Sequence, residues 1–106
     1  MLIRLKREYF TQMKEGFKKL EIRVCYPNLK NIKPGSVVTF ECGHDHLLVE
    51  MNDVRKYKTF VDMLDKEDYR LIAKDKTKQE VLEICKSIYP PVKEALGVLV
   101  FDVKLL

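Results

Sequence analysis

The sequence predicts an α+β fold built on a mostly antiparallel, strongly curved β-sheet. Three observations support this prediction. Five segments have the pattern of strands and four have that of helices, and their order is β-α-β-β-β-α-α-α-β, without regular βαβ repeats. Because the chain has only 106 residues, five strands favour a small barrel or half-barrel, and a closed barrel also removes exposed sheet edges.

The N-terminal part of the chain predicts a strand over residues 2–6 and a helix over residues 7–16. Apolar and charged residues alternate in the first segment, as they do in a half-buried strand. In the second segment, Tyr9, Met13 and Phe17 recur every four residues, which places them on one face of a helix. These segments form the first strand and the first helix of the predicted order.

Residues 18–25 predict a second strand, which follows a glycine. Gly16 lies where a glycine lets the backbone leave a helix with a positive φ. Alternate apolar residues of the strand are expected in the core: Leu20, Ile22 and Val24. Glu21 and Arg23 are two residues apart, so they point together to the opposite side.

The middle of the chain predicts a loop followed by a hairpin. Residues 26–35 form the loop, and its Pro34-Gly35 pair suits a type II turn. Strands are expected over residues 37–41 and 47–56, joined by the turn 42–46. This hairpin supplies the third and fourth strands.

The second half predicts three helical segments and a last strand. Short helices are expected over residues 60–64 and 69–73. Thr77 and Glu80 have the spacing of a capping box at the start of a longer helix, which the Pro90-Pro91 pair ends. Alternate apolar residues of the last strand, which Gly97 opens, share one face: Leu99, Phe101, Val103 and Leu105.

The composition is that of one globular domain spanning residues 1–106. Hydrophobic residues make up 46% of the chain and charged residues 34%, without a long block of one sign. No apolar run reaches the roughly 18 residues of a membrane span, and the charged N-terminus is not a signal peptide. Three widely spaced cysteines predict reduced thiols in the cytoplasm: Cys25, Cys42 and Cys85.

The segment with the most functional information is Gly16-Phe17-Lys18-Lys19-Leu20-Glu21-Ile22-Arg23. A carboxylate and a guanidinium on one face of a strand, with Lys18 at the strand entrance, would make a polar site on a rigid element. The alternative is a solvated pair of neighbouring charges, and such pairs stabilise by only roughly 0.2–1 kcal/mol.

Gly16, Lys18, Glu21 and Arg23 match the pattern G-x-K-x-x-E-x-R, and on this pattern the chain resembles the ASCH family. The resemblance is nearest to the small single-domain members of archaea and bacteria, and it covers almost the whole chain. It implies a PUA-like β-barrel with flanking helices. Further segments follow in the family's order: Tyr26-Pro27, residues 32–35, residues 56–60, residues 88–90 and residues 97–99.

The resemblance implies RNA binding, or chemistry on RNA-derived nucleosides, in a cleft beside the second strand. Lys18, Glu21 and Arg23 would line this cleft, and Gly16 would permit close backbone approach at its rim. Lys18 and Arg23 suit a phosphate or a base carbonyl, and Glu21 could orient Arg23 or accept from an exocyclic amino group. Tyr26, directly after the strand, is the best candidate for stacking on a base.

Three further tyrosines are also candidates for stacking on a base: Tyr9, Tyr57 and Tyr89. The alternative for all four tyrosines, Tyr26 included, is that they are amphipathic residues at the edge of the core. Basic residues surround the motif and would form an RNA footprint if they make one continuous patch: Arg4, Lys6, Arg7, Lys14, Lys18, Lys19 and Arg23. Their alternative role is to solubilise the chain.

A function of another class is a small hydrolase acting on a modified nucleoside, with Lys18 and Glu21 as the acid–base pair. This hypothesis requires Lys18 to be at least partly desolvated beside Glu21. One ASCH branch hydrolyses N-acetylated cytidine with the motif lysine, a threonine at position 21 and a glutamate before the last long helix. The chain departs from that branch at Glu21 and at Lys74-Asp75-Lys76. A protein–protein module without a role in nucleic-acid binding is a third possibility.

Cys42, His44 and His46, together with Asp45, have a spacing that suits metal ligands on an extended segment. The same residues also suit the exposed tip of a hairpin, and no second cluster of ligands is visible in the sequence. We therefore predict no metal and no cofactor.

Overall fold

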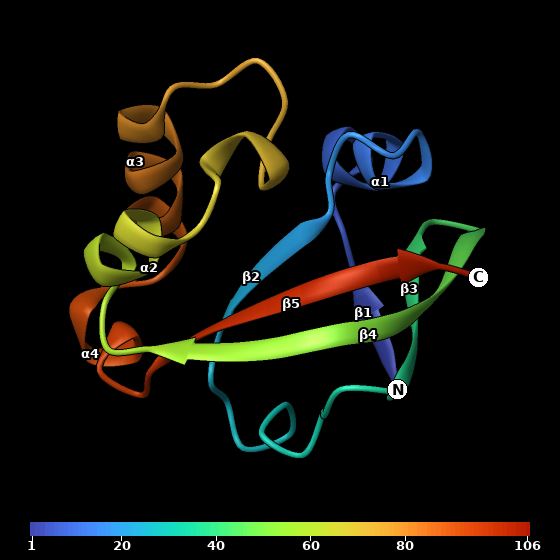
Figure 1. Cartoon of the computed structure of the whole chain (residues 1–106), viewed down its shortest axis with the longest axis horizontal. Helices are drawn as coiled ribbons and strands as arrows, with labels where there is room; N and C mark the ends of the chain where they lie inside the picture. Colours follow the sequence, from blue (N-terminus) through green and yellow to red (C-terminus); the bar gives the residue numbers. More distant parts are fainter.

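The computed structural model describes all 106 residues, and its centre is one five-stranded sheet with the order β1-β3-β4-β5-β2 (Figure 1). Neighbouring strands are antiparallel except β1 and β3, which run parallel. The predicted α+β fold with a mostly antiparallel sheet is confirmed. The strands are β1 (Leu2–Arg4), β2 (Leu20–Val24), β3 (Val37–Cys42), β4 (Asp45–Tyr57) and β5 (Val98–Leu105).

The sheet curls without closing, so it forms a half-barrel, the more open of the two predicted forms. Its two edge strands are β1 and β2. A side chain bridges these edges, because Nη2 of Arg23 on β2 donates to the carbonyl oxygen of Arg4 on β1 at 2.6 Å. A cavity at this gap is described below.

Helices cover two regions of the sheet. Helix α1 lies beside the ends of β1 and β2, whereas α2, α3 and α4 gather at the opposite end of the molecule, on the left in Figure 1. None of the helices is long and apolar enough to cross a membrane. The helices are α1 (Arg7–Lys14), α2 (Phe60–Lys66), a 3₁₀ turn η1 (Tyr69–Leu71), α3 (Lys78–Ile88) and α4 (Pro91–Glu94).

The predicted start and end of α3 are confirmed, and the prolines have a second effect. The Thr77 hydroxyl accepts from the Glu80 amide, and the Glu80 carboxylate accepts from the Thr77 amide, which completes the capping box. Pro91 begins α4, which the sequence analysis did not predict. Proline is tolerated in the first turn of a helix because the amide it lacks has no partner there.

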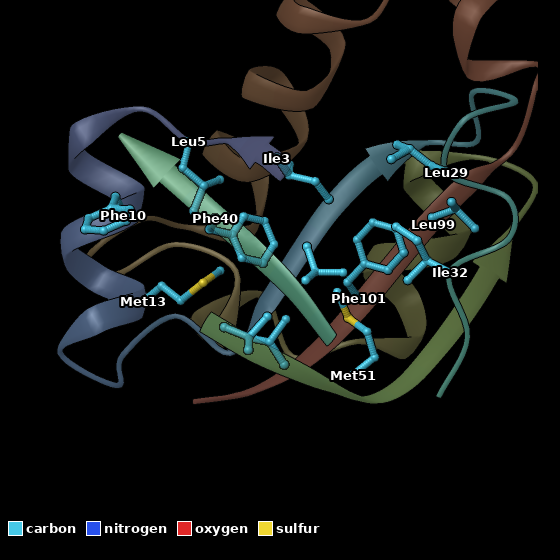
Figure 2. Close-up of a cluster of buried hydrophobic side chains, with 13 residues drawn as sticks. Ile3, Leu5, Phe10, Met13, Leu29, Ile32, Phe40, Met51, Leu99 and Phe101 are labelled. Carbon is cyan, nitrogen blue, oxygen red and sulfur yellow. The ribbon is translucent and has the colours of Figure 1, made fainter. Parts of the chain in front are cut away.

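Strand β5 is buried on both faces. Leu99, Phe101 and Val103 point into a core inside the curl of the sheet, which they share with Phe10 and Met13 of α1. Figure 2 shows Leu99 and Phe101 near Leu29 and Ile32 of the loop. Val98 and Val100 point the other way, into a second core with α2 and α3. The alternation of apolar residues in the sequence predicted only the first of these two faces.

The β3–β4 turn is tighter than predicted, because Cys42 pairs directly with Asp45. Asp45 accepts from Nη1 of Arg7 at 2.8 Å, and His46 Nε2 lies 3.3 Å from a Glu41 carboxylate oxygen. The structure brings no three His, Cys, Asp or Glu side chains together as metal ligands.

Candidate functional site

Lys18 carries a buried charge just before β2, and its side chain is only 3% exposed. Its ammonium nitrogen lies 2.6 Å from the Leu20 carbonyl oxygen, 2.8 Å from the Ile72 carbonyl oxygen and 3.0 Å from Glu21 Oε1. An ammonium has three N–H donors, and here three protein oxygens receive them. The hypothesis that Lys18 is desolvated beside Glu21 is confirmed.

Glu21 lies between two cations and is itself 7% exposed. Oε1 faces Lys18, and Oε2 accepts from Nε of Arg23 at 2.6 Å. Burial by itself raises the pKa of Glu21, but the charges of Lys18 and Arg23 and their hydrogen bonds outweigh it and hold the pKa below its ordinary value of 4.5. Glu21 is therefore an anion at neutral pH, and the interpretation as a solvated surface pair is wrong.

This depressed pKa predicts a loss of stability in acid. A carboxylate whose pKa is lower in the folded state contributes stability above its unfolded pKa, and loses it as the pH falls through the folded pKa. We expect the free energy of unfolding to decrease progressively below about pH 5, measured by urea unfolding at a series of pH values. In Glu21→Gln, which has no titrating group at this position, the same acid limb should be shallower; equal slopes would contradict the prediction.

Arg23 connects the buried pair to the surface. Its Nε binds Glu21 and its Nη2 binds the Arg4 carbonyl oxygen, while Nη1 makes no hydrogen bond to the protein. The Arg23 side chain is 24% exposed. Two nitrogen atoms of the Arg23 guanidinium are thus held by the protein, and the third, Nη1, keeps its N–H donors free.

A cavity of about 220 Å³ lies against these residues, between β2, α1 and α3. Ten of its 15 lining residues are apolar. Lys18, Glu21 and Arg23 supply polar groups to it, and Arg4 and Lys6 add two more cations. The remaining wall consists of Leu5, Tyr9, Ile22, Ile72, Ala73, Val81, Ile84, Cys85, Ile88 and Tyr89.

The structure brings the three charged motif residues together in this cavity, whereas Gly16 and Tyr26 do not line it. Tyr26 lines a neighbouring hollow that also contacts Arg4, Arg23 and Tyr89, and its ring centroid lies 6.3 Å from that of Tyr89. Gly16 lines a third hollow, together with Lys18. A Cβ at Gly16 would meet nothing within 4 Å, so its structural requirement is the φ of 88° and not a close approach of the backbone.

Two of the other three candidate tyrosines line the cavity, and one does not. Tyr9 and Tyr89 line the cavity, whereas the Tyr57 hydroxyl donates to Glu67, which does not line it. The α3 residues Ile84 and Ile88 were missed as wall residues. Their spacing fits the buried stripe of a helix, and no sequence signal distinguishes a cavity wall from a core contact.

The basic residues around the motif have different surroundings. Arg4, Lys6 and Arg23 line the cavity, but Arg7 binds Asp45 in the β3–β4 turn. Two lysines before α3, Lys74 and Lys76, also have partners within the protein. Lys74 Nζ lies 3.9 Å from the centroid of the Phe17 ring, and Lys76 Nζ lies 3.6 Å from Glu8 Oε1. The cations beside the cavity are thus a subset of the predicted footprint.

Comparison with known proteins identifies the family. The family model described as the ASCH domain matches residues 3–103. The chain belongs to the ASCH family. This ASCH domain is similar to the crystal structure of hypothetical protein PH0355, with a TM-score of 0.89, 29% identity, and coverage of 99% of this chain and 97% of that one.

The ASCH domain is also similar to the solution NMR structure of protein PF0455 from Pyrococcus furiosus. The TM-score is 0.77 at 29% identity, and the match covers 100% of this chain and 98% of that one. No curated protein matches the chain. The resemblance inferred from the G-x-K-x-x-E-x-R pattern, and the fold it implied, are confirmed.

The cavity of this ASCH domain combines an apolar wall with a few polar groups. Its walls are apolar, its polar groups are already ordered by mutual hydrogen bonds, and the free donors of Arg23 lie beside it. Cys85 supplies no ready nucleophile, because burial raises the pKa of its thiol to about 11.

Proposed function

We propose that this ASCH domain binds RNA, or a nucleotide derived from RNA, by accepting one base in the cavity between β2 and α3. The observation that carries the proposal is the Arg23 guanidinium, which is held by Glu21 and the Arg4 carbonyl oxygen while Nη1 stays free beside an apolar cavity. Arginine in this state is a preorganised donor for phosphate or for a base carbonyl.

The size and lining of the cavity support one base better than a larger ligand. Its volume of about 220 Å³ is below the roughly 300 Å³ at which pockets for drug-sized molecules begin. Tyr9 and Tyr89 supply aromatic surface, and single-stranded bases commonly stack on such side chains. Arg4 and Lys6 extend the positive charge to where a phosphate would lie.

The hydrolase alternative receives less support from the geometry. The three N–H donors of Lys18 point to protein oxygens, so its ammonium holds Glu21 and the β2 backbone in place. The lowered pKa of Glu21 makes it a weak base. The ammonium of Lys18 has no donor left for a substrate, and Glu21 is a poor proton acceptor.

Binding should depend on Arg23 and on ionic strength. We expect the dissociation constant for a labelled single-stranded RNA or tRNA to rise roughly tenfold or more in Arg23→Ala, because hydrogen bonds to a charged group are lost. Affinity should also fall as salt is raised, since phosphate contacts release counterions. Fluorescence anisotropy at two salt concentrations measures both effects, with circular dichroism to verify that the variant is folded.

Lys104→Ala is the matched control. Lys104 is exposed near the end of β5 and does not line the cavity, so its removal subtracts one positive charge at another place. Equal losses in the two variants would show that binding depends on net charge alone. If the wild-type protein binds no RNA at micromolar concentration, the proposal is wrong, and hydrolysis of modified nucleosides becomes the next assay.

A further inference from the structure

The outer edge of β2 faces away from the rest of the sheet, and its hydrogen-bonding pattern shows which residues present their backbone there. The Cys25 amide donates to Gly97, and the Val103 amide donates to Lys19, across the β2–β5 ladder. In an antiparallel pair, hydrogen-bonded positions alternate. The odd-numbered residues of β2 therefore bind β5, and the even-numbered residues turn their N–H and C=O groups outward.

Two of these outward groups have partners within the chain. The Leu20 carbonyl oxygen accepts from Lys18 Nζ, and the Val24 carbonyl oxygen accepts from the Tyr26 amide. Ile22, between them, has no hydrogen bond from either its N–H or its C=O to any other part of the protein. Ile22 is only 9% exposed, and unpaired backbone groups at buried positions are rare.

Ile22 is one of the residues that line the cavity. Glu21 and Ile22 point to opposite faces of β2, yet both line the same cavity, so the cavity runs along the edge of the strand between those faces. Lys18 marks the same edge, because it reaches the outward Leu20 carbonyl oxygen and also lines the cavity. A donor and an acceptor of one residue are thus presented side by side to whatever the cavity holds.

We propose that the Ile22 backbone reads the hydrogen-bonding edge of the bound base. The Ile22 N–H donates to a ring nitrogen or carbonyl oxygen, and the Ile22 C=O accepts from the neighbouring N–H of the base. The ligand class is therefore a nucleotide whose base has an adjacent donor and acceptor on its Watson–Crick edge, and a base methylated on that edge is rejected. This inference rests on the proposed function, since it assigns the contacts of the same cavity.

An extended peptide also pairs with strand edges, but the surroundings favour a base. The free edge amounts to one complete residue, because Lys18 and Tyr26 already occupy the carbonyl oxygens on both sides of it. A peptide gains affinity from several successive backbone bonds, whereas a base needs only two. Arg4, Lys6 and Arg23 beside the cavity match the phosphate of a nucleotide.

The test uses the four ribonucleoside 5′-monophosphates and the counterpart of each that carries a methyl group on the Watson–Crick edge. Binding is followed by two-dimensional ¹H–¹⁵N NMR of the full chain. We expect the Ile22 amide to show a large downfield shift with the unmodified nucleotide. The methylated counterpart should bind roughly tenfold or more weakly, because the methyl group removes one of the two hydrogen bonds and keeps the base edge away from the strand.

A proline variant tests the same contact on the protein side. Ile22→Pro removes an N–H that faces the open edge and no ladder bond, a position at which strands tolerate proline. We expect Ile22→Pro to weaken nucleotide binding roughly tenfold. If this variant fails to fold, the methylated nucleotides decide the question.

The outcomes separate this inference from the proposed function. Equal binding of methylated and unmodified nucleotides would overturn the assignment to Ile22 and leave nucleotide binding intact. Absence of binding by every nucleotide and by the labelled RNA would overturn both. An Ile22 shift caused by an extended peptide, without one caused by any nucleotide, would also overturn both and identify a peptide site.

Discussion

Replacing Lys18 by methionine is expected to destabilise the protein by about 3–5 kcal/mol, because it leaves Glu21 as an undercompensated charge in a buried site. The change also removes the partner of the Leu20 and Ile72 carbonyl oxygens. Methionine fills a similar volume, so the loss reports on charge and hydrogen bonding more than on packing. Urea unfolding and thermal melting of the wild type and variant measure it.

Lys19→Met is the control for this prediction, because Lys19 is the exposed neighbour and should change stability by no more than about 0.5 kcal/mol. The double variant Lys18→Met/Glu21→Gln removes both members of the pair. It should be more stable than the sum of the single changes predicts, since no unpaired carboxylate remains. A Lys18→Met variant within about 1 kcal/mol of the wild type would show that Lys18 is not a structural charge.

A second large loss of stability is expected when Arg55 of β4 is replaced. Its Nε and Nη2 bind the two oxygens of Glu67 at 2.6 and 2.8 Å, and its Nη1 lies 2.9 Å from Asp53 and 3.2 Å from Asp102. The Glu67 side chain is nearly buried, and the hydroxyl of Tyr57 donates to it as well. This network fixes the end of α2 against β4 and β5.

Arg55→Met is therefore expected to cost about 2–3 kcal/mol, less than the Lys18 change because Arg55 is partly exposed. The hydrogen bonds of Arg55, opposed by burial, hold the pKa of Glu67 below its ordinary value, so that pKa should rise in the variant. Arg70→Met is the control: Arg70 binds Asp68 in the same two-oxygen manner but is exposed, and such a pair contributes about 0–1 kcal/mol. Equal losses for the two arginines would contradict the argument from burial.

The sequence predicted the elements of the fold better than their arrangement. The capping box at Thr77 and the glycine after α1 depend on neighbouring residues, and local chemistry is visible in a sequence. The parallel pairing of β1 with β3, and the burial of Val98 and Val100, depend on which strands become neighbours. No local pattern contains that information, because it is decided by contacts between distant segments.

For the candidate site too, the sequence predicted which residues take part better than it predicted how they are arranged. The G-x-K-x-x-E-x-R pattern identified Lys18, Glu21 and Arg23, which the structure brings together. It did not show that the donors of Lys18 point inward to two backbone carbonyl oxygens, one of them 54 positions along the chain. The contribution of α3 to the cavity was hidden for a similar reason, since an apolar stripe fits a core contact as well as a cavity wall.

The central position of β5 has a consequence for how the protein is made. This strand is the last of the five in chain order, yet it lies between β4 and β2 and contributes to both cores. Until residues 98–105 emerge, β2 has no strand partner, and the charges of Glu21 and Arg23 sit on an unpaired segment. The five-stranded sheet can therefore form only after residues 98–105 have been synthesised, and until then the nascent chain carries unpaired strand edges on β2 and β4.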